Sequence, residues 1–164
     1  MYLVIDAYNV IHAIPFLEAR LQVNLRASRD ALISVCVQIQ KKRRDISHII
    51  IVFDGASEHR DLDHPEYPGI KVVYTETAED ADDRIVDIMS EYKENEPMVI
   101  VSNDHSVLNN AKAFGRKSLS AEMFYQLFKA SPEKDKNSVK SASKLSAKEE
   151  NEITEAYKKI WGVE

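Results

Sequence analysis

The chain has 164 residues, enough for one compact domain but too few for two of ordinary size. Apolar residues make up 44% of it and charged residues 30%, a composition typical of folded globular proteins and not of disordered chains. The formal net charge of -5 argues against a protein that coats nucleic acid nonspecifically. It leaves open an enzyme whose carboxylates hold a metal against a phosphate substrate.

The cysteine content and the hydropathy limit where the protein works. A single cysteine, Cys36, excludes an internal disulfide and a cysteine-based zinc site, and it favours a reducing compartment. No stretch approaches the roughly 20 apolar residues that span a bilayer, and the first residues lack the features of a signal peptide. We therefore expect a cytoplasmic protein without a membrane partner.

The first third of the sequence predicts a buried strand, a loop and a long helix. The strand is the apolar run MYLVID, which ends at Asp6. A loop that contains Asn9 is expected to follow. Residues 26–44 then repeat apolar side chains at helical spacing and close on KKRR, and basic residues are favourable at the C-terminal end of a helix.

The later elements repeat the alternation of strands and helices. HIIIVFDG is a second apolar strand, which stops at Asp54, and PMVIVSND is a later one, which ends at Asp104. Further elements are predicted for a strand IKVVYT, a helix that contains TAEDADDRIVDI, a helix near 105–113, a strand near 116–119 and a helix from Ala121 with Ser120 as its N-cap.

This order of elements predicts an α/β fold with three layers. Continuously apolar strands separated by helices are typical of a parallel sheet that is covered on both faces. The Lys- and Ser-rich residues 131–145 are expected to form a linker. The last segment, 146–164, begins with a capping box of Ser146 and Glu149 and carries an apolar stripe, so a C-terminal helix is predicted there.

Three of the predicted strands deliver an aspartate at their carboxyl end: Asp6, Asp54 and Asp104. Ligands of open α/β sheets bind at this edge, and the three carboxylates converge there if the first strand lies between the second and the fourth. Such a cluster is stable when a divalent cation neutralises it, and oxygen ligands suit Mg²⁺ or Mn²⁺. The competing interpretation is that each aspartate only caps the turn or helix that follows it.

The stretch TAEDADDRIVDI adds further acids, and helical geometry separates their roles. Thr77 and Asp80 match a capping box, so the helix start alone accounts for Asp80. At about 100° per residue, Asp82 falls on the flank of the core face, whereas Asp83 points nearly opposite to it. Asp82 is therefore predicted to lean toward the other acids, and Asp83 to face water.

Four blocks of the sequence resemble a known family in order and spacing. VIDAYNVIHA (4–13), IVFDG (51–55), ETAEDADDRI (76–85) and VIVSNDHSV (99–107) are similar to the YacP-like branch of the NYN group of PIN-like ribonuclease domains. The resemblance covers about residues 1–130, and the tail 145–162 is similar to a C-terminal segment of some such proteins. It implies a three-layer PIN-like nuclease fold, followed by the linker and the C-terminal helical tail.

The resemblance also implies a set of site residues. The acidic positions of the family fall on Asp6, Asp54, Asp82 and Asp104 as catalytic residues and ligands of Mg²⁺ or Mn²⁺. Asn9 matches an asparagine that would orient a ligand or the substrate. The extra acid in DADD leaves the register of that block open, so Asp80 and Asp83 remain alternatives to Asp82, and His105 stands where relatives often carry arginine.

The resulting hypothesis is a metal-dependent endoribonuclease in RNA processing or decay, with RNA, including ribosome-bound mRNA, as its partner. Arg26, Arg29 and Asn103 are the predicted substrate contacts, the two arginines because they begin the helix that follows the Asn9 loop. The alternative is a non-catalytic RNA- or ribosome-binding adaptor with the same fold. A phosphohydrolase of the haloacid-dehalogenase type is disfavoured, because FDG lacks the D-x-D spacing of its nucleophile.

Overall fold

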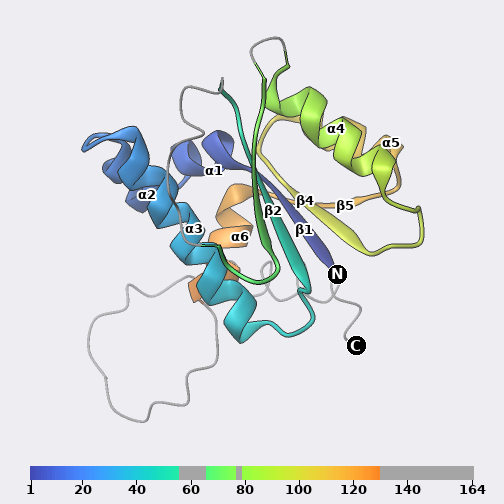
Figure 1. Ribbon diagram of the computed structural model, residues 1–164. Coiled ribbons are helices and arrows are strands. Elements are labelled where there is room, and N and C mark those ends of the chain that lie inside the picture. Colours follow the sequence, from blue (N-terminus) through green and yellow to red (C-terminus); the bar gives the residue numbers. More distant parts are fainter. Residues whose placement is uncertain (56–65, 77–78, 130–164) are drawn as a thin grey trace, which may run out of the picture.

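A five-stranded parallel sheet forms the centre of the molecule. The computed structural model describes residues 1–55, 66–76 and 79–129. The strand order is β3-β2-β1-β4-β5, and every neighbouring pair is parallel. The strands, shown in Figure 1, are β1 (Tyr2–Asp6), β2 (His48–Phe53), β3 (Ile70–Tyr74), β4 (Met98–Val101) and β5 (Lys117–Leu119).

Helices cover both faces of this sheet (Figure 1), which makes the fold a three-layer α/β structure, as predicted. Four helices lie on one face: α1 (Ala7–Ala13), α2 (Pro15–Leu21), α3 (Leu25–Lys42) and α6 (Ala121–Lys129). The other face carries α4 (Ala81–Glu91) and α5 (His105–Ala113). Within the described residues, no helix is both long and apolar enough to cross a membrane.

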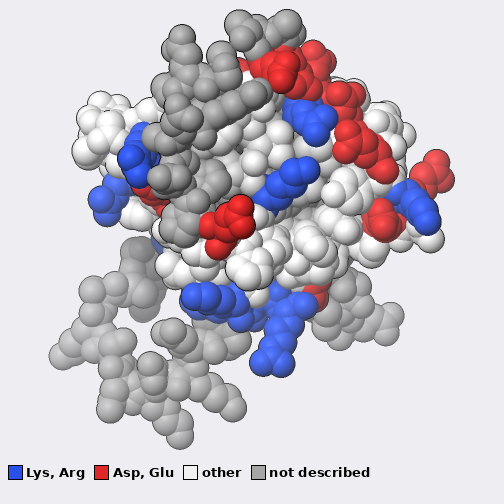
Figure 2. All heavy atoms as spheres, in the orientation of Figure 1, with Lys and Arg blue, Asp and Glu red and all other residues white. Residues whose placement is uncertain are grey.

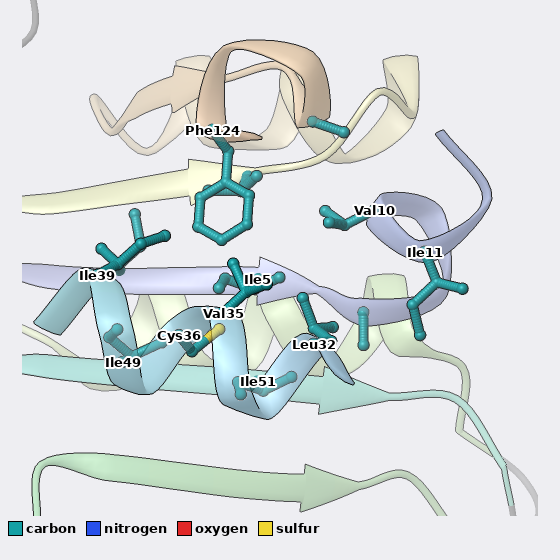
Figure 3. Close-up of a cluster of buried hydrophobic side chains, with 14 of the residues drawn as sticks. Ile5, Val10, Ile11, Leu32, Val35, Cys36, Ile39, Ile49, Ile51 and Phe124 are labelled. Atoms are coloured by element: carbon teal, nitrogen blue, oxygen red, sulfur yellow. The ribbon is translucent and has the colours of Figure 1, made fainter. Parts of the chain in front are cut away.

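Alternation along the strands divides the apolar side chains between two cores. In β1, Leu3 and Ile5 pack beneath α3 and α6, whereas Val4 faces α4 and α5. Figure 3 shows the larger core, where Ile5 lies among side chains of α3 and opposite Phe124 of α6. Each fully buried side chain of this kind contributes about 1.5–3 kcal/mol. The sheet edge that carries the candidate site therefore rests on packed layers on both sides.

The strands and the longer helices confirm the sequence predictions. The first strand lies between the second and the fourth, as convergence of the acids requires. The helix predicted near 105–113 is α5, and the hydroxyl of Ser120 accepts a hydrogen bond from the backbone N–H of Met123 at the start of α6. The predicted linker 131–145 and C-terminal helix 146–164 lie outside the described residues.

Two local predictions were wrong. The expected Asn9 loop is helical, because Ala7, Val10 and Ile11 are buried at helical spacing and α1 starts directly after Asp6. The helix of the DADD block does not start at a capping box of Thr77 and Asp80. It begins at Ala81, and Asp80 is itself the N-cap.

Arg116 fixes the far end of α4, the helix that carries Asp82. Its guanidinium is buried and donates hydrogen bonds to backbone carbonyls in the last turn of α4 and in the connection from α4 to β4. The acceptors are Met89, Tyr92, Lys93, Glu94 and Glu96. This contact orders the connection after α4, so it helps to define where the helix lies against the sheet.

Candidate active site

Asp6 lies at the carboxyl end of the central strand and is only 6% exposed. Its carboxylate is held by Ser102, which directly follows β4: the Ser102 hydroxyl donates to Asp6 Oδ2 at 2.8 Å. The same hydroxyl accepts a hydrogen bond from the backbone N–H of Asp104 at 2.9 Å. Ser102 thus joins two of the predicted acids across neighbouring strands.

Asp54 has a similar support at the end of β2. Thr75, buried after β3, donates from its hydroxyl to Asp54 Oδ1 at 3.1 Å and accepts from the backbone N–H of Gly55 at 3.1 Å. Sequence reasoning missed both Ser102 and Thr75. The signal that could have found them is position, because each hydroxyl residue follows a predicted strand whose neighbour ends in an aspartate.

Asp104 is the N-cap of α5, so the competing interpretation of a capping residue is correct in part. Its Oδ1 accepts hydrogen bonds from the backbone N–H groups of Ser106 at 2.7 Å and Val107 at 3.3 Å. Because both bonds use the same oxygen, capping does not require Oδ2. A carboxylate can therefore cap this helix and contribute charge to the site as well.

Asp82 lies in the first turn of α4 and is turned toward the other acids. Burial, followed by the charges of Asp104 and Asp6, raises the pKa of Asp82 to about 6. Asp83, by contrast, is exposed, and its backbone N–H donates to the cap Asp80 at 2.8 Å. The structure thus places Asp82 and Asp83 as their helical positions predicted, although the catalytic role of Asp82 stays a prediction.

The electrostatics of Asp6 describe a site with excess negative charge. Burial raises the pKa of Asp6, hydrogen bonds from the Ser102 hydroxyl and the Asn9 backbone lower it, and the charges of Asp104 and Asp54 raise it again. Within the described part of the chain, every charge that shifts the pKa of Asp6 or Asp82 belongs to another carboxylate. Asp104 therefore acts on both Asp6 and Asp82 through space, and Asp54 acts on Asp6.

The carboxylate oxygens of this cluster are suitable ligands for a divalent cation, but the side chains lie too far apart to bind one ion together. Carboxylate oxygens are the ligands that Mg²⁺ and Mn²⁺ prefer, and a cation would offset the mutual repulsion. Among residues 1–55, 66–76 and 79–129, however, no three Asp, Glu, His or Cys side chains are close enough together to hold a metal ion.

Two asparagines tie the elements around the site together. Asn9 Oδ1, in α1, accepts a hydrogen bond from the backbone N–H of Asn103 at 2.6 Å. The Asn103 side chain accepts from the backbone N–H of Ala121 at 2.8 Å and donates to Glu122, so it caps α6. In this structure the side chains of both asparagines hold backbone N–H groups in place. The predicted contact of Asn103 with substrate remains a prediction.

Arg29, one of the predicted substrate contacts, is only 2% exposed. Its Nε donates to the hydroxyl of Tyr8 at 2.9 Å, and its Nη2 contacts the same oxygen. The guanidinium carbon lies 5.3 to 5.7 Å from the ring centroids of Tyr8, Phe53 and Tyr74. These rings would have to move before Arg29 could reach RNA, so its contact with substrate stays a prediction.

Exposed charges are distributed unevenly over the surface. Arg26 is exposed and lies 3.8 Å from Asp30, one helical turn along α3. Figure 2 shows acidic side chains along α4, whereas Lys and Arg side chains gather near the C-terminal end of α3. The exposed residues of that end are Lys41, Lys42 and Arg44. Cations of this kind are available for contacts with phosphate.

Comparison with known proteins agrees with this architecture. A family model described as "YacP-like NYN domain" matches residues 3–162, beyond the 1–130 of the resemblance. No curated protein gives a match. The crystal structure of Rae1 (YacP) from Bacillus subtilis is 20% identical, with a TM-score of 0.66, and the match covers 99% of this chain and 82% of that chain. A point mutant of the same Bacillus protein is 23% identical with a TM-score of 0.62, covering 79% and 74%.

Proposed function

Because the chain belongs to the family of YacP-like NYN domains, we propose that it is a metal-dependent endoribonuclease that cleaves RNA phosphodiesters in RNA processing or decay. Family membership supports a nuclease-type function related to RNA. The observation that carries the finer proposal is the group of aspartates at the carboxyl edge of the sheet, where α/β folds bind ligands. In this group the charges of Asp104 and Asp54 raise the pKa of Asp6, and those of Asp104 and Asp6 raise the pKa of Asp82. Ribosome-bound mRNA is part of the proposed partner class.

Asp6, Asp82 and Asp104 would hold Mg²⁺ or Mn²⁺, with Asp54 as a further ligand. The cation would supply a water of lowered pKa and a positive charge for the phosphate. The chain's own contribution is orientation: Ser102 fixes the Asp6 carboxylate and Thr75 fixes that of Asp54. Hydrogen-bonded supports of this kind keep carboxylate ligands in place before a cation arrives.

The charge pattern indicates how RNA would approach. Without a cation the acidic edge repels phosphate, so binding should depend on the cation and on arginines around the site. Arg26 is exposed and available for such a contact. Arg29 supports Tyr8, which precedes Asn9 in α1, so we propose that it orders this wall of the site as well as serving RNA.

One observation favours the alternative of a non-catalytic RNA- or ribosome-binding adaptor. In the described residues the acids do not reach the spacing of a metal site. An adaptor would bind RNA without cutting it, and its binding would not depend on Asp82.

Adjacent aspartates of α4 offer a matched test. Purified protein with Mg²⁺ or Mn²⁺ should cut RNA, and Asp82→Asn should reduce the rate about 100-fold or more, because one charge of the cation site is lost. Asp83→Asn makes the same chemical change on the exposed neighbour and should cut at nearly the wild-type rate. Rates are measured with labelled RNA under single-turnover conditions, and circular dichroism confirms that both variants are folded.

The outcomes separate the two functions. Equal rates for the two variants would remove Asp82 from the site. Cation-independent RNA binding by a wild-type protein that cuts no RNA would favour the adaptor.

A further inference from the structure

An apolar groove away from the carboxylate site is lined by residues of α2, α3 and α6. Figure 1 shows these three helices on the same side of the sheet. Its volume of about 560 Å³ falls within the range of ligand-binding clefts. Phe16 in its wall is 42% exposed, although large aromatic side chains are usually covered. The lining residues that carry the argument are Phe16, Ala31, Ser34, Val35, Tyr125 and Phe128.

Cationic side chains lie over the aromatic rings of this groove. The pairs are Arg20 over Phe16 at 5.6 Å, Lys42 over Phe128 at 5.7 Å and Lys129 over Tyr125 at 4.8 Å. Arginine and lysine side chains are long and can move aside while their charges stay at the rim. The groove thus combines an apolar floor with a rim that is mostly basic, with Asp30 as the acid among its lining residues. Such a groove suits an amphipathic segment that carries acids beside its apolar stripe.

The chain itself supplies a segment with these properties. Residues 146–164 follow α6, whose last residue, Lys129, is next to Phe128 in the groove wall. In their sequence, Ile153, Tyr157 and Ile160 recur at helical spacing. Acids are interspersed among them at Glu149, Glu150, Glu152 and Glu155, and the lysines of the segment, Lys148, Lys158 and Lys159, lie toward its two ends.

The linker is long enough for this segment to reach the groove, and the tether makes even weak binding effective. The linker 131–145 has a root-mean-square span of roughly 20 Å if it behaves as a flexible chain. A tether of this length keeps the segment at an effective concentration in the millimolar range, so even a weak contact would be occupied. The family match, which runs to residue 162, includes the segment in the domain.

We propose that residues 146–162 bind as an amphipathic helix in the groove between α2, α3 and α6 of the same chain. The apolar stripe covers the exposed ring of Phe16 and the half-buried rings of Tyr125 and Phe128, and the glutamates pair with the basic side chains of the rim. This inference is independent of the proposed nuclease function.

Trp161 makes the proposal measurable, because it is the only tryptophan of the chain. In the full chain its fluorescence should be blue-shifted and poorly quenched by acrylamide. Ser34→Glu places a charge in the groove on an exposed position of α3, and it should shift the emission to the red and increase the quenching. Ser90→Glu makes the same substitution at an exposed position of α4, on the other face of the sheet, and should change neither the emission nor the quenching.

A change in the segment and a dilution series complete the test. Ile153→Asp should expose Trp161 as Ser34→Glu does, with circular dichroism of the core unchanged. Protection that is the same across dilution supports binding within one chain. Protection that falls on dilution, together with a dimer in analytical ultracentrifugation, would assign the groove to a second copy and overturn the proposal. The proposal would also be overturned if Trp161 is already exposed in the wild type, or if its emission and quenching do not change in Ser34→Glu.

Discussion

Ser102 and Thr75 place buried hydroxyl groups beside two carboxylates of the site. Each hydroxyl donates a hydrogen bond to the aspartate of a neighbouring strand and accepts one from a backbone N–H, so it acts as both donor and acceptor. A buried hydroxyl without such partners would be costly. These residues therefore stabilise the fold through the same hydrogen bonds that orient Asp6 and Asp54.

Ser102→Ala should lower the free energy of unfolding by about 1–3 kcal/mol, because it leaves Asp6 Oδ2 and the N–H of Asp104 without this partner. RNA cleavage should fall as well, since the Asp6 carboxylate loses its orientation. Urea unfolding and cleavage rates measure the two effects. Ser118→Ala on β5, an exposed position, is the control and should stay within about 0.5 kcal/mol of wild type. Unchanged stability in Ser102→Ala would contradict the proposed support.

Asp82→Asn should stabilise the cation-free protein at neutral pH. The pKa of Asp82 is raised from 3.8 to about 6, so ionisation costs more in the folded protein than in the unfolded one. The wild type should therefore lose stability relative to the variant as the pH rises from about 4 to about 6. The difference should be on the order of 1 kcal/mol, since solvent screens this half-buried group.

Urea unfolding in EDTA at a series of pH values measures this difference. At pH 4 and below, the two proteins should unfold at nearly the same urea concentration, which is an internal control. A constant difference from pH 4 to pH 7 would show that the charge of Asp82 is not the cause.

At the scale of elements, α4 and α5 both begin with an aspartate cap, but only Asp104 is a ligand in the proposed cation site. Asp80 Oδ1 accepts from the N–H of Asp83, and Asp104 Oδ1 accepts from the first turn of α5. Asparagine caps a helix about as well as aspartate does, but it carries no charge. The two helices therefore allow capping to be separated from catalysis.

Asp80→Asn and Asp104→Asn should each keep the free energy of unfolding within about 0.5 kcal/mol of wild type. Only Asp104→Asn should lose RNA cleavage. The corresponding alanine variants should each cost about 1 kcal/mol, because the cap is then lost. Denaturant unfolding and cleavage assays on the four variants provide the comparison. Loss of cleavage in Asp80→Asn would transfer the ligand role to Asp80.

The sequence was most informative about elements that are continuous and buried. Four of the strands lie where apolar runs predicted them, and β5 lies at the short strand predicted near 116–119. Asp6, Asp54 and Asp104 follow from where three of the apolar runs stop. The short helices α1 and α2 were missed because seven residues give a weak periodic signal, and packing rather than propensity stabilises them.

The site was predictable in its acids but not in the groups around them. The flank position of Asp82 followed from helical geometry, whereas the start of α4 did not, because several adjacent acids could have served as its cap. The aromatic surroundings of Arg29 come from α1, β2 and β3. Only the tertiary fold brings these elements together, so no local pattern shows that this arginine is buried.

At the scale of the whole molecule, the repulsion among the acids should make stability depend on divalent cations. Mg²⁺ or Mn²⁺ should raise the melting temperature, and a cation at 100 times its dissociation constant would add about 2.7 kcal/mol. EDTA should reverse the shift. Asp6→Asn should abolish most of it, because Asp6 lies at the centre of the cluster.

Thermal unfolding followed by circular dichroism at constant ionic strength measures this effect. Asp83→Asn, which changes an exposed acid, is the matched variant and should retain the shift. A cation-induced shift of equal size in Asp6→Asn would place the binding site elsewhere in the chain.

The hydrogen bond between Asp6 and Ser102 joins residues that are 96 positions apart in the chain. β1 is made before the other described strands, but it gains β4 as its second neighbour only after most of the domain has been made. A nascent chain that stops before Ser102 has Asp6, Asp54 and Asp82 but neither the hydroxyl that orients Asp6 nor Asp104. If these acids cut RNA as proposed, cleavage has to wait until the sheet is complete, and an unfinished copy cannot attack the message from which it is being translated.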